Sequence, residues 1–497
     1  MPMAREVVQA CVVGGGVLGC AVARELQRRG RQTLLLEKHT VGSGVSAGNT
    51  GIACTLMGVA KDTVERKCLE LGRPQNLSTY RSLGIPHKAT GALYVAWTTA
   101  ELTELAALQD LEDDCRFVQK EELQQLEPCL APACGAVLVS GEVTVDPGLV
   151  PLALALDAER RGARVQQHRE VIDARTDGES WILELRDGGQ VVADQVVHCG
   201  GLSAGGLEPS LSFKPRRGDY LLFQRPPFCA TPPISRPIGS VPSPHARGVY
   251  VWPTVHGDVV CGPTNVEQEH QQLPAPSDDT LESLRQKALA VCPALAAWRV
   301  AGTYAGLRPA LEPSAFGHDY LLRTEGRWSS ISGVRSTGLT ASLGIAQLLA
   351  ERFSLPGPSD LPGPVLPALE QLPAHYHDGC LRLNSDWQIA HPQTLLGLST
   401  SASLPLPGAE SKLKKQKTKM LMHQVIEKQK LERILRDILS LEAERNNEAM
   451  ADPEVVKAKA EDAIKAADIS MSRNMTTAVV PEPSENLPDP TEKPRRD

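Results

Sequence analysis

Three glycines near the amino terminus have the spacing of a phosphate-binding turn. Gly14, Gly16 and Gly19 follow an apolar run over residues 7–13 without an intervening loop. Gly14 permits a tight turn from strand to helix, Gly16 lets a pyrophosphate approach the backbone, and Gly19 lets the helix pack closely on the strand. A helix predicted over residues 17–29 points its unpaired N–H groups at the phosphates. The pattern therefore predicts a dinucleotide site.

A carboxylate stands where the second strand of such a unit ends. Residues 33–36 form another apolar run, and Glu37 follows it, eighteen residues beyond Gly19. A carboxylate at this place binds the two hydroxyls of an adenosine ribose and disfavours a 2′-phosphate. We assign Lys38 to the same site. FAD and NAD remain as candidate dinucleotides, and a glycine-rich turn of some other doubly wound domain is the alternative.

Composition limits the class of protein. The 497 residues suffice for two packed domains with extra segments, and a net charge of −7 with a pI near 6.0 gives no reason to expect nucleic acid. The twelve cysteines are scattered without a CxxC pair, so we expect no metal site and a reducing compartment, the cytosol or alternatively the mitochondrial matrix. No run of eighteen apolar residues predicts a transmembrane segment.

The stretch after the second strand carries a resemblance to a known family. Residues 42–54 read GSGVSAGNTGIAC, a turn-rich composition that supplies backbone N–H groups and hydroxyls. This loop resembles that of FAD-dependent oxidoreductases typified by D-amino-acid oxidase, FAD-dependent glycerol-3-phosphate dehydrogenase and L-2-hydroxyglutarate dehydrogenase. The resemblance implies that the loop wraps the FAD pyrophosphate and the ribityl side of the flavin through Ser46, Asn49, Thr50 and Gly51.

One departure from the family concerns the proton acceptor. The similar hydroxyacid enzymes usually carry a histidine just before the loop asparagine and another shortly after it. This chain has Gly48 and Cys54 at those places. The general base is therefore left open between Tyr250 and His256, each of which is also an ordinary sheet or turn residue.

Two further segments resemble FAD contacts of the family. The apolar run over residues 191–198 leads to Gly201, where small residues let the backbone approach the adenine half of FAD. The segment Trp328–Thr340 combines a strand, a glycine-rich turn and a helix start, an arrangement that favours anions. The resemblance across this turn favours FAD over NAD, and it implies contacts from Gly333, Ser336, Gly338, Leu339 and Thr340.

The middle of the chain resembles the substrate sheet of the family. Runs over 220–223, 248–254 and 258–264 alternate apolar residues around turns, which predicts antiparallel strands. The later Gly-Leu-Arg-Pro sequence resembles a turn of the family, and the resemblance implies that Arg308 projects over the flavin toward an anionic substrate. A guanidinium group suits this task because its planar fork orients a carboxylate or phosphate.

The predicted fold is α/β, with a doubly wound, Rossmann-like FAD-binding domain, an antiparallel-sheet substrate domain and a helical C-terminal extension. We expect the basic helix over 412–441 to bind a partner protein or a membrane surface. The predicted boundaries are: oxidoreductase core 1–355, with the FAD domain in 1–80, 145–205 and 325–355 and the substrate domain in 81–144 and 206–324; Pro/Ser-rich linker 356–408; basic helical extension 409–469; disordered tail 470–497.

These features predict an enzyme that oxidises the CH–OH group of a small anionic substrate by hydride transfer to flavin N5. A 2-hydroxyacid such as L-2-hydroxyglutarate and glycerol 3-phosphate both fit. An amino-acid or amine oxidase on the same fold is one alternative. An FAD-binding assembly or scaffold protein that acts through its C-terminal helix is another. The electron acceptor stays open between oxygen, a quinone and a carrier flavoprotein.

Overall fold

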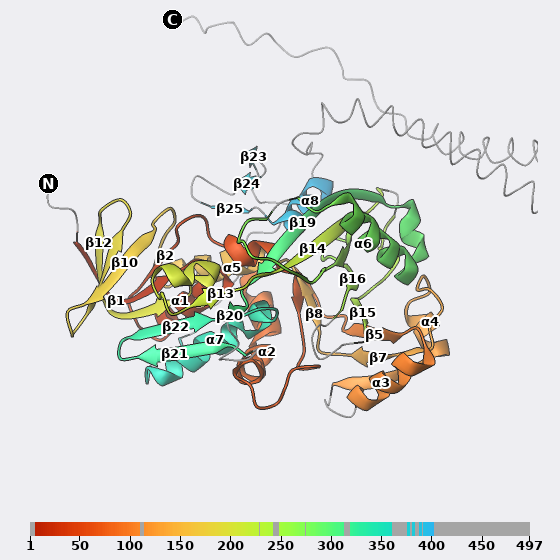
Figure 1. The fold of residues 1–497 in the computed structure, drawn as a ribbon, viewed down its shortest axis with the longest axis horizontal. Coiled ribbons are helices and arrows are strands. Elements are labelled where there is room, and N and C mark those ends of the chain that lie inside the picture. Colours follow the sequence, from red (N-terminus) through yellow and green to blue (C-terminus); the bar gives the residue numbers. More distant parts are fainter. Residues whose placement is uncertain are drawn as a thin grey trace, which may run out of the picture. The chain divides into compact units, whose positions relative to one another are not determined.

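The computed structural model describes residues 5–109, 114–227, 229–241, 248–273, 275–312, 319–359, 375–377, 380–382, 387–389 and 391–401. The chain divides into two units after Pro405, and every element below belongs to the first (Figure 1). The predicted basic helix over 412–441, the extension over 409–469 and the tail over 470–497 lie outside the described residues. None of the described helices is long and apolar enough to cross a membrane.

A mixed sheet with a parallel centre forms the first layer, in the order β10-β11-β12-β1-β2-β9, with β22 pairing β12 and β21 pairing β22. Strand β1 lies between β2 and β12 and is parallel to both. The strands span β1 Arg5–Val13, β2 Thr33–Leu36, β9 Arg164–Gln166, β10 Val171–Thr176, β11 Trp181–Leu185, β12 Gln190–His198, β21 Leu321–Glu325 and β22 Trp328–Ser332.

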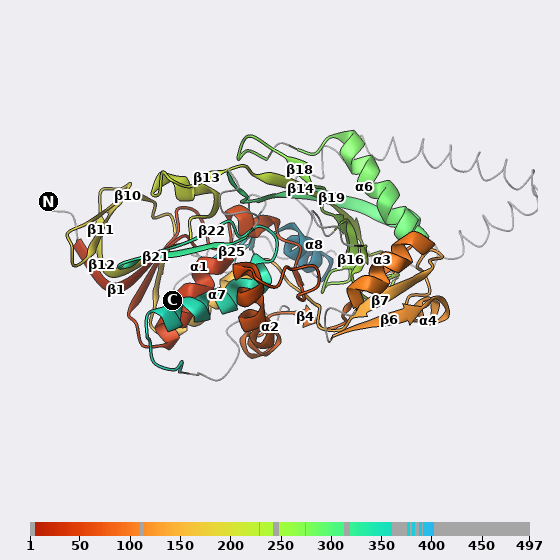
Figure 2. The same ribbon diagram turned by 60° about the horizontal axis from the view of Figure 1, so that its bottom comes forward.

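The apolar residues of this sheet face two different cores. Val12 and Leu35 pack with the helices, whereas Val13 and Leu36 join a second cluster with Trp328 and the β10–β11 hairpin. Strands that are buried on both faces are apolar almost throughout, which is why these runs lack polar alternation. The helices of the first core are α1 Val17–Arg28, α2 Val64–Leu83, α5 Leu149–Arg160 and α7 Gly338–Arg352, of which α1 and α7 lie side by side (Figure 2).

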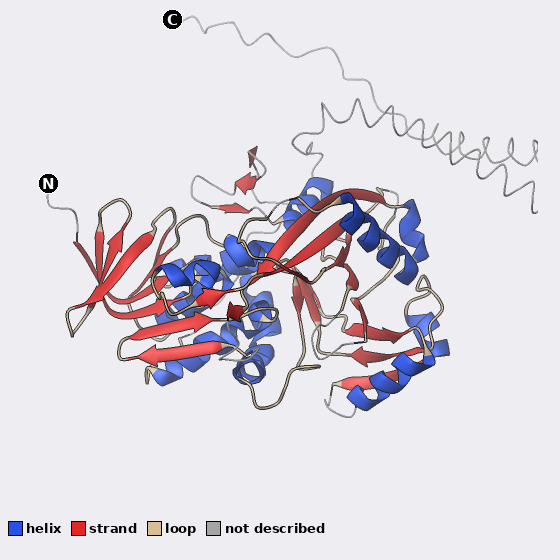
Figure 3. Ribbon diagram, in the orientation of Figure 1, coloured by secondary structure: helices blue, strands red, loops and turns tan. Residues whose placement is uncertain are grey.

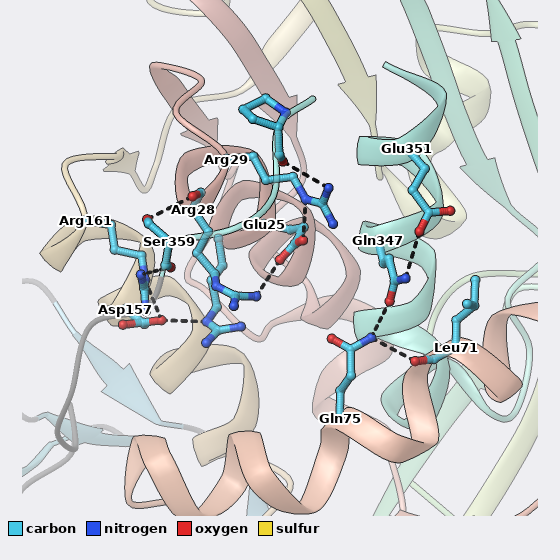
Figure 4. A network of polar contacts seen from close by, with 12 residues as sticks. Glu25, Arg28, Arg29, Leu71, Gln75, Asp157, Arg161, Gln347, Glu351 and Ser359 are labelled. Atoms are coloured by element: carbon cyan, nitrogen blue, oxygen red, sulfur yellow. Dashed lines mark hydrogen bonds and ion pairs between the residues drawn. The ribbon is translucent and has the colours of Figure 1, made fainter. Parts of the chain in front are cut away.

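Buried ion pairs and hydrogen bonds join these helices (Figure 4). Asp157 of α5 accepts from Arg24 of α1 at 2.6 Å and from Arg161 at 3.0 Å. Burial opposes the charged carboxylate, but the two guanidinium groups hold the pKa of Asp157 below its ordinary value. On the other side, Gln75 of α2 donates to Gln347 of α7. The ion pair of Arg24 with Asp157 holds α1 against α5 and so fixes the direction of its N-terminus. The bond between Gln75 and Gln347 joins α2 to α7.

The second layer is a nine-stranded sheet in the order β18-β14-β17-β16-β15-β5-β7-β6, with β19 pairing β14. Figure 3 draws the strands of both layers in red and the helices in blue. All its pairings are antiparallel except that of β5 with β15. The elements are β5 Ala92–Ala96, β6 Cys115–Gln119, β7 Gly135–Val139, β14 Arg216–Gln224, β15 Ile238–Ser240, β16 Tyr250–Pro253, β17 Val259–Gly262, β18 Val266–Glu267 and β19 Arg299–Arg308, with helices α3 Thr99–Gln109, α4 Lys120–Leu126 and α6 Asp278–Val291.

Short elements connect the two layers or follow them. Strand β8 pairs with both β3 and β4, β13 pairs with β20, and β24 lies between β23 and β25. The bounds are β3 Ile52–Ala53, β4 His87–Lys88, β8 Val143–Val145, β13 Ser212–Phe213, β20 Leu311–Glu312, β23 His375–His377, β24 Cys380–Arg382, β25 Gln388–Ile389, α8 Pro392–Ser401, and the 3₁₀ helices η1 Gly44–Gly48, η2 Gly201–Gly206 and η3 Pro293–Ala297.

Part of the predicted linker over 356–408 belongs to the folded core, which corrects that prediction. Trp387 and Ile389 are buried in the same apolar cluster as the helices, and Leu396 of α8 is buried against the substrate sheet. The high proline content of 356–373 suggested a linker over the whole stretch. The apolar positions after it are too few for a recognisable period, so only packing shows where they belong.

Helices α2 and α7 cross at a pair of glycines. A Cβ on Gly344 would collide with the backbone of Cys68 and Gly72, and a Cβ on Gly72 would lie 2.7 Å from the carbonyl oxygen of Thr340. This close approach places the N-terminal turn of α7 beside the end of β22.

We therefore expect Gly344→Val to lower the free energy of unfolding by about 3 kcal/mol, because the helices must separate to admit the side chain. Denaturant unfolding followed by circular dichroism measures this loss. Gly357→Ala is the control, since no atom lies within 4 Å of a Cβ at Gly357. Equal stability of the two variants would contradict the crossing described here.

Candidate functional site

A cavity of about 1670 Å³ opens where the two layers meet. Its walls come from the C-terminal ends of β1, β2, β12 and β22, from the loop that contains η1, and from strands β14, β16 and β19 of the second sheet. Ligands of open α/β sheets bind outside the carboxyl ends of the strands. The cavity occupies that position and continues onto the substrate sheet.

The structure brings most of the predicted site residues together around this cavity. They come from segments more than three hundred residues apart, at both the nucleotide end and the substrate end. The predicted residues that line it are Gly14, Gly16, Glu37, Lys38, Ser46, Asn49, Thr50, Gly201, Tyr250, Arg308, Gly333, Ser336, Gly338 and Leu339.

Three predicted cofactor residues lie behind the wall instead of on it. Gly19 meets the carbonyl group of Gly14, so it permits the close packing of helix on strand. Gly51 has a φ of +72°, and a Cβ there would lie 2.6 Å from the oxygen of Val145. Thr340 is buried, and its hydroxyl accepts a hydrogen bond from the backbone N–H of Cys54 at 3.0 Å. The three shape the site without lining it.

His256 does not line the cavity, so its role as a general base stays a prediction that this geometry does not support. Its Nε2 lies 2.6 Å from Asp146 Oδ2, and Gly397 of α8 packs against its ring. The turn of His256 follows Pro253, at the opposite end of β16 from Tyr250. Sequence proximity to Tyr250 suggested a shared site, but the extended strand separates the two.

The nucleotide end is built on the first turn of α1. Gly16 occupies the N-cap position without a side-chain cap, and the N–H of Val17 donates to Ser46 Oγ at 2.9 Å. Glu37 is buried, and its carboxylate accepts from the N–H groups of Gly15 at 2.6 Å and His39 at 2.7 Å. This arrangement suits a dinucleotide, because the glycines leave room for phosphate and the carboxylate is held in one place for ribose hydroxyls.

Close backbone contact explains why Gly48 departs from the family pattern. A Cβ on Gly48 would collide with the backbone of Gly306 in β19. Likewise, a Cβ on Gly306 would lie 2.5 Å from the carbonyl oxygen of Gly48. A histidine cannot occupy this position without displacing the strand. The contact also sets the distance between the η1 loop and Arg308, which follows Gly306 by two residues.

The guanidinium group of Arg308 is held along β14. Its Nη1 donates to the carbonyl oxygen of Arg217 at 3.4 Å and its Nη2 to that of Thr264 at 3.3 Å. Gly218 makes this possible, since a Cβ there would lie 3.1 Å from Arg308 Nη2. The side chain therefore presents a fixed cation to the substrate end of the cavity.

Sequence reasoning missed several residues of this wall. Glu142, Tyr220, Cys54 and Arg335 line the cavity, and Tyr94 lies behind Tyr250 with a hydroxyl separation of 2.9 Å. No motif marks Glu142, which occupies a turn between two short strands. Only the burial of Glu142, with 1% of the residue exposed, distinguishes it from other glutamates of the chain. No group of His, Cys, Asp and Glu within the described residues has the arrangement of a metal site.

The segment before α8 holds the η1 loop from outside. His391 Nε2 donates to the carbonyl oxygen of Asn49 at 3.1 Å, and its Nδ1 accepts from the N–H of Gln393 at 3.3 Å. Gln393 in turn donates to the carbonyl oxygen of Thr50 at 3.0 Å. Burial lowers the pKa of His391 to about 4, and the neutral ring matches both of its hydrogen bonds.

The chain is similar to a known family of flavoenzymes and to several of its members. The model of the family described as "DAO: FAD dependent oxidoreductase" matches residues 9–352. The chain is 25% identical over 355 residues to a glycerol 3-phosphate dehydrogenase of Caloramator mitchellensis, covering 67% of this chain and 71% of the relative. It is 26% identical over 316 residues to a glycine oxidase of Bacillus subtilis, covering 61% of this chain and 81% of the relative.

A solved structure shares the fold. The L-alpha-glycerophosphate oxidase of Mycoplasma pneumoniae, whose structure contains FAD, superposes with a TM-score of 0.64 at 23% identity. The match covers 72% of this chain and 97% of that one. The arrangement of the two sheets is therefore shared with this flavoprotein.

The buried imidazole predicts acid sensitivity. Because the unfolded chain protonates His391 near pH 6.5 and the folded chain only near 4, stability falls as the pH drops through this window. We expect a contribution of about 2–3 kcal/mol to this loss. In His391→Gln the amide still donates to Asn49, so thermal unfolding between pH 7 and 4.5 should show a smaller drop in midpoint. An unchanged pH dependence would contradict a neutral, buried His391.

Proposed function

The chain belongs to the DAO family of FAD dependent oxidoreductases, and on that premise we propose that it oxidises the CH–OH group of a small anionic substrate. A 2-hydroxyacid such as L-2-hydroxyglutarate and glycerol 3-phosphate are the proposed substrates. FAD, when bound, supplies the hydride acceptor at its N5 atom. The residues of the chain hold the two reactants and exclude water.

The position of Arg308 in the cavity wall is the observation that carries this proposal. It lines the substrate end of the cavity, and its two backbone hydrogen bonds fix the plane of the guanidinium group. An orienting cation is needed because the reacting C–H must point at the flavin in one direction. Arginine binds carboxylate or phosphate through two parallel hydrogen bonds, so the pair also fixes substrate orientation.

The remaining lining residues have distinct proposed tasks. Glu37 holds the ribose hydroxyls, and the first turn of α1 faces the pyrophosphate. Gly338 and Leu339 begin α7, whose N-cap Thr337 makes no side-chain capping bond. The N-terminus of this helix would favour negative charge at the neighbouring edge of the flavin ring.

Oxidation of an amino acid is the second candidate function. The identity of the chain to the glycine oxidase, 26%, is close to its identity to the glycerol 3-phosphate dehydrogenase, 25%. Arg308 would bind the carboxylate of an amino acid equally well. The two candidates therefore differ in the group that is oxidised and share the anion site.

An anaerobic substrate panel separates these candidates. We expect the visible spectrum of the FAD-loaded protein to bleach with L-2-hydroxyglutarate or glycerol 3-phosphate and to remain unchanged with glycine, sarcosine or D-alanine. Bleaching by amino acids alone would replace the proposal with the amine reaction. A flavin spectrum that none of these compounds changes would favour the assembly or scaffold function.

Replacement of Arg308 tests the anion site. We expect Arg308→Met to weaken substrate binding by roughly 10²-fold, since a charge-assisted bidentate pair is lost. The concentration dependence of flavin bleaching measures this effect. Arg116→Gln is the control, because Arg116 is exposed on β6 and pairs with Glu122 outside the cavity. Equal affinity in Arg308→Met and the unsubstituted protein would remove Arg308 from the site.

A further inference from the structure

Oxidation of an alcohol releases a proton as well as a hydride, so a group in the cavity wall must accept that proton. Gly48 has no side chain to accept it, and Cys54 packs its Sγ 3.4 Å from the hydroxyl of Thr340. His256 lies outside the cavity wall. A proton acceptor must therefore come from another part of the wall.

A buried carboxylate and two phenols form a continuous hydrogen-bonded chain at this place. Tyr250 lines the cavity, and its hydroxyl lies 2.9 Å from that of Tyr94. The Tyr94 hydroxyl lies 3.1 Å from Glu142 Oε1. The two rings meet edge to face at a centroid distance of 5.9 Å, which holds both hydroxyls in line.

The direction of these bonds follows from chemistry. The Tyr94 hydroxyl donates to Glu142 Oε1. Because the Tyr94 proton lies in that bond, the Tyr94 oxygen accepts a hydrogen bond from the hydroxyl of Tyr250. A phenol oxygen has two lone pairs, so the hydroxyl of Tyr250 can accept from a substrate hydroxyl as well as donate to Tyr94.

We propose that Tyr250, Tyr94 and Glu142 form a proton relay that removes the hydroxyl proton of the substrate. This inference rests on the proposed oxidation of a CH–OH group. The substrate O–H bond breaks as its proton passes to Tyr250; the Tyr250 proton passes to Tyr94, and the Tyr94 proton to Glu142 Oε1. The C–H bond breaks with transfer of its electron pair to FAD as hydride, and the C=O bond forms.

The groups that face Glu142 support this role. Thr55, in the segment before α2, directs its N–H and its hydroxyl at Oε1, each at 3.4 Å. Arg73 of α2 and Asp114 before β6 form an ion pair at 2.7 Å beside the neighbouring Gly141. Tyr94 of β5 donates to the same oxygen of Glu142.

Glu142→Gln and Tyr94→Phe test the relay. We expect each to slow anaerobic flavin reduction by roughly 10²–10⁴-fold, the range for loss of general base catalysis. We also expect the rate of Glu142→Gln to lose the increase with pH that deprotonation of a base produces. Matched controls are Glu127→Gln, a carboxylate of equal burial paired with Arg236, and Tyr80→Phe, a buried phenol, both outside the cavity wall. These controls should keep the unsubstituted rate and pH profile.

Binding of an unreactive anion supplies a measurement that does not depend on turnover. We expect 2-oxoglutarate, or inorganic phosphate if glycerol 3-phosphate is the substrate, to perturb the flavin spectrum with unchanged affinity in Glu142→Gln and Tyr94→Phe. Arg308→Met should weaken this binding. Slower reduction with intact binding supports the relay.

Three outcomes would overturn the relay. Unchanged reduction rates in both variants would show that the proton leaves by another path. A parallel loss of anion affinity would make Glu142 a residue that shapes the substrate site. Bleaching by amino acids, with their affinity reduced in Glu142→Gln, would make it a partner of an ammonium group. Failure of the proposed function itself is distinct, since the unsubstituted protein would then be bleached by neither hydroxy compound.

Discussion

The contact between the backbones of Gly48 and Gly306 determines how the two layers of the protein meet. It joins the η1 loop of the nucleotide layer to β19 of the substrate layer with no side chain between them. Ser46 binds the first turn of α1 from the same loop. A shift of this contact would move the phosphate end and Arg308 together, so one packing constraint governs both ends of the cavity.

The loop is also held from its outer side by a segment more than three hundred residues away. His391 and Gln393 bind the backbone of Asn49 and Thr50, and the neighbouring Thr394 donates to Asp146 at 2.6 Å. Burial opposes the Asp146 charge, but hydrogen bonds from His256 and Thr394 keep its pKa below the ordinary value. The same carboxylate accepts from the N–H of Leu149 at the start of α5. His256 thus contacts the carboxylate that also binds the start of α5.

Two opposed electrostatic features meet at the substrate end. Arg308 is a cation held by backbone carbonyl groups, whereas Glu142 is a buried carboxylate reached through two phenols. In the proposed reaction, an anionic substrate would bind to the first and deliver its proton toward the second. Placement of these charges on separate elements keeps them from neutralising each other, because a direct pair would consume both functions.

The sequence by itself determined the features that depend on local backbone chemistry: the glycine turn before α1, Glu37 after β2, the turn before α7 and Arg308 before its proline. Glycine spacing and strand-length apolar runs encode these directly, and the resemblance to the FAD-dependent family rested on them. Only the tertiary structure decided which residues face the cavity. It placed His256, Gly19, Gly51 and Thr340 outside the wall, joined residues 387–389 and 391–398 to the core, and brought Glu142 to Tyr94 and Tyr250. These relations depend on strand register and on packing between distant segments, and no local pattern in a single chain records either.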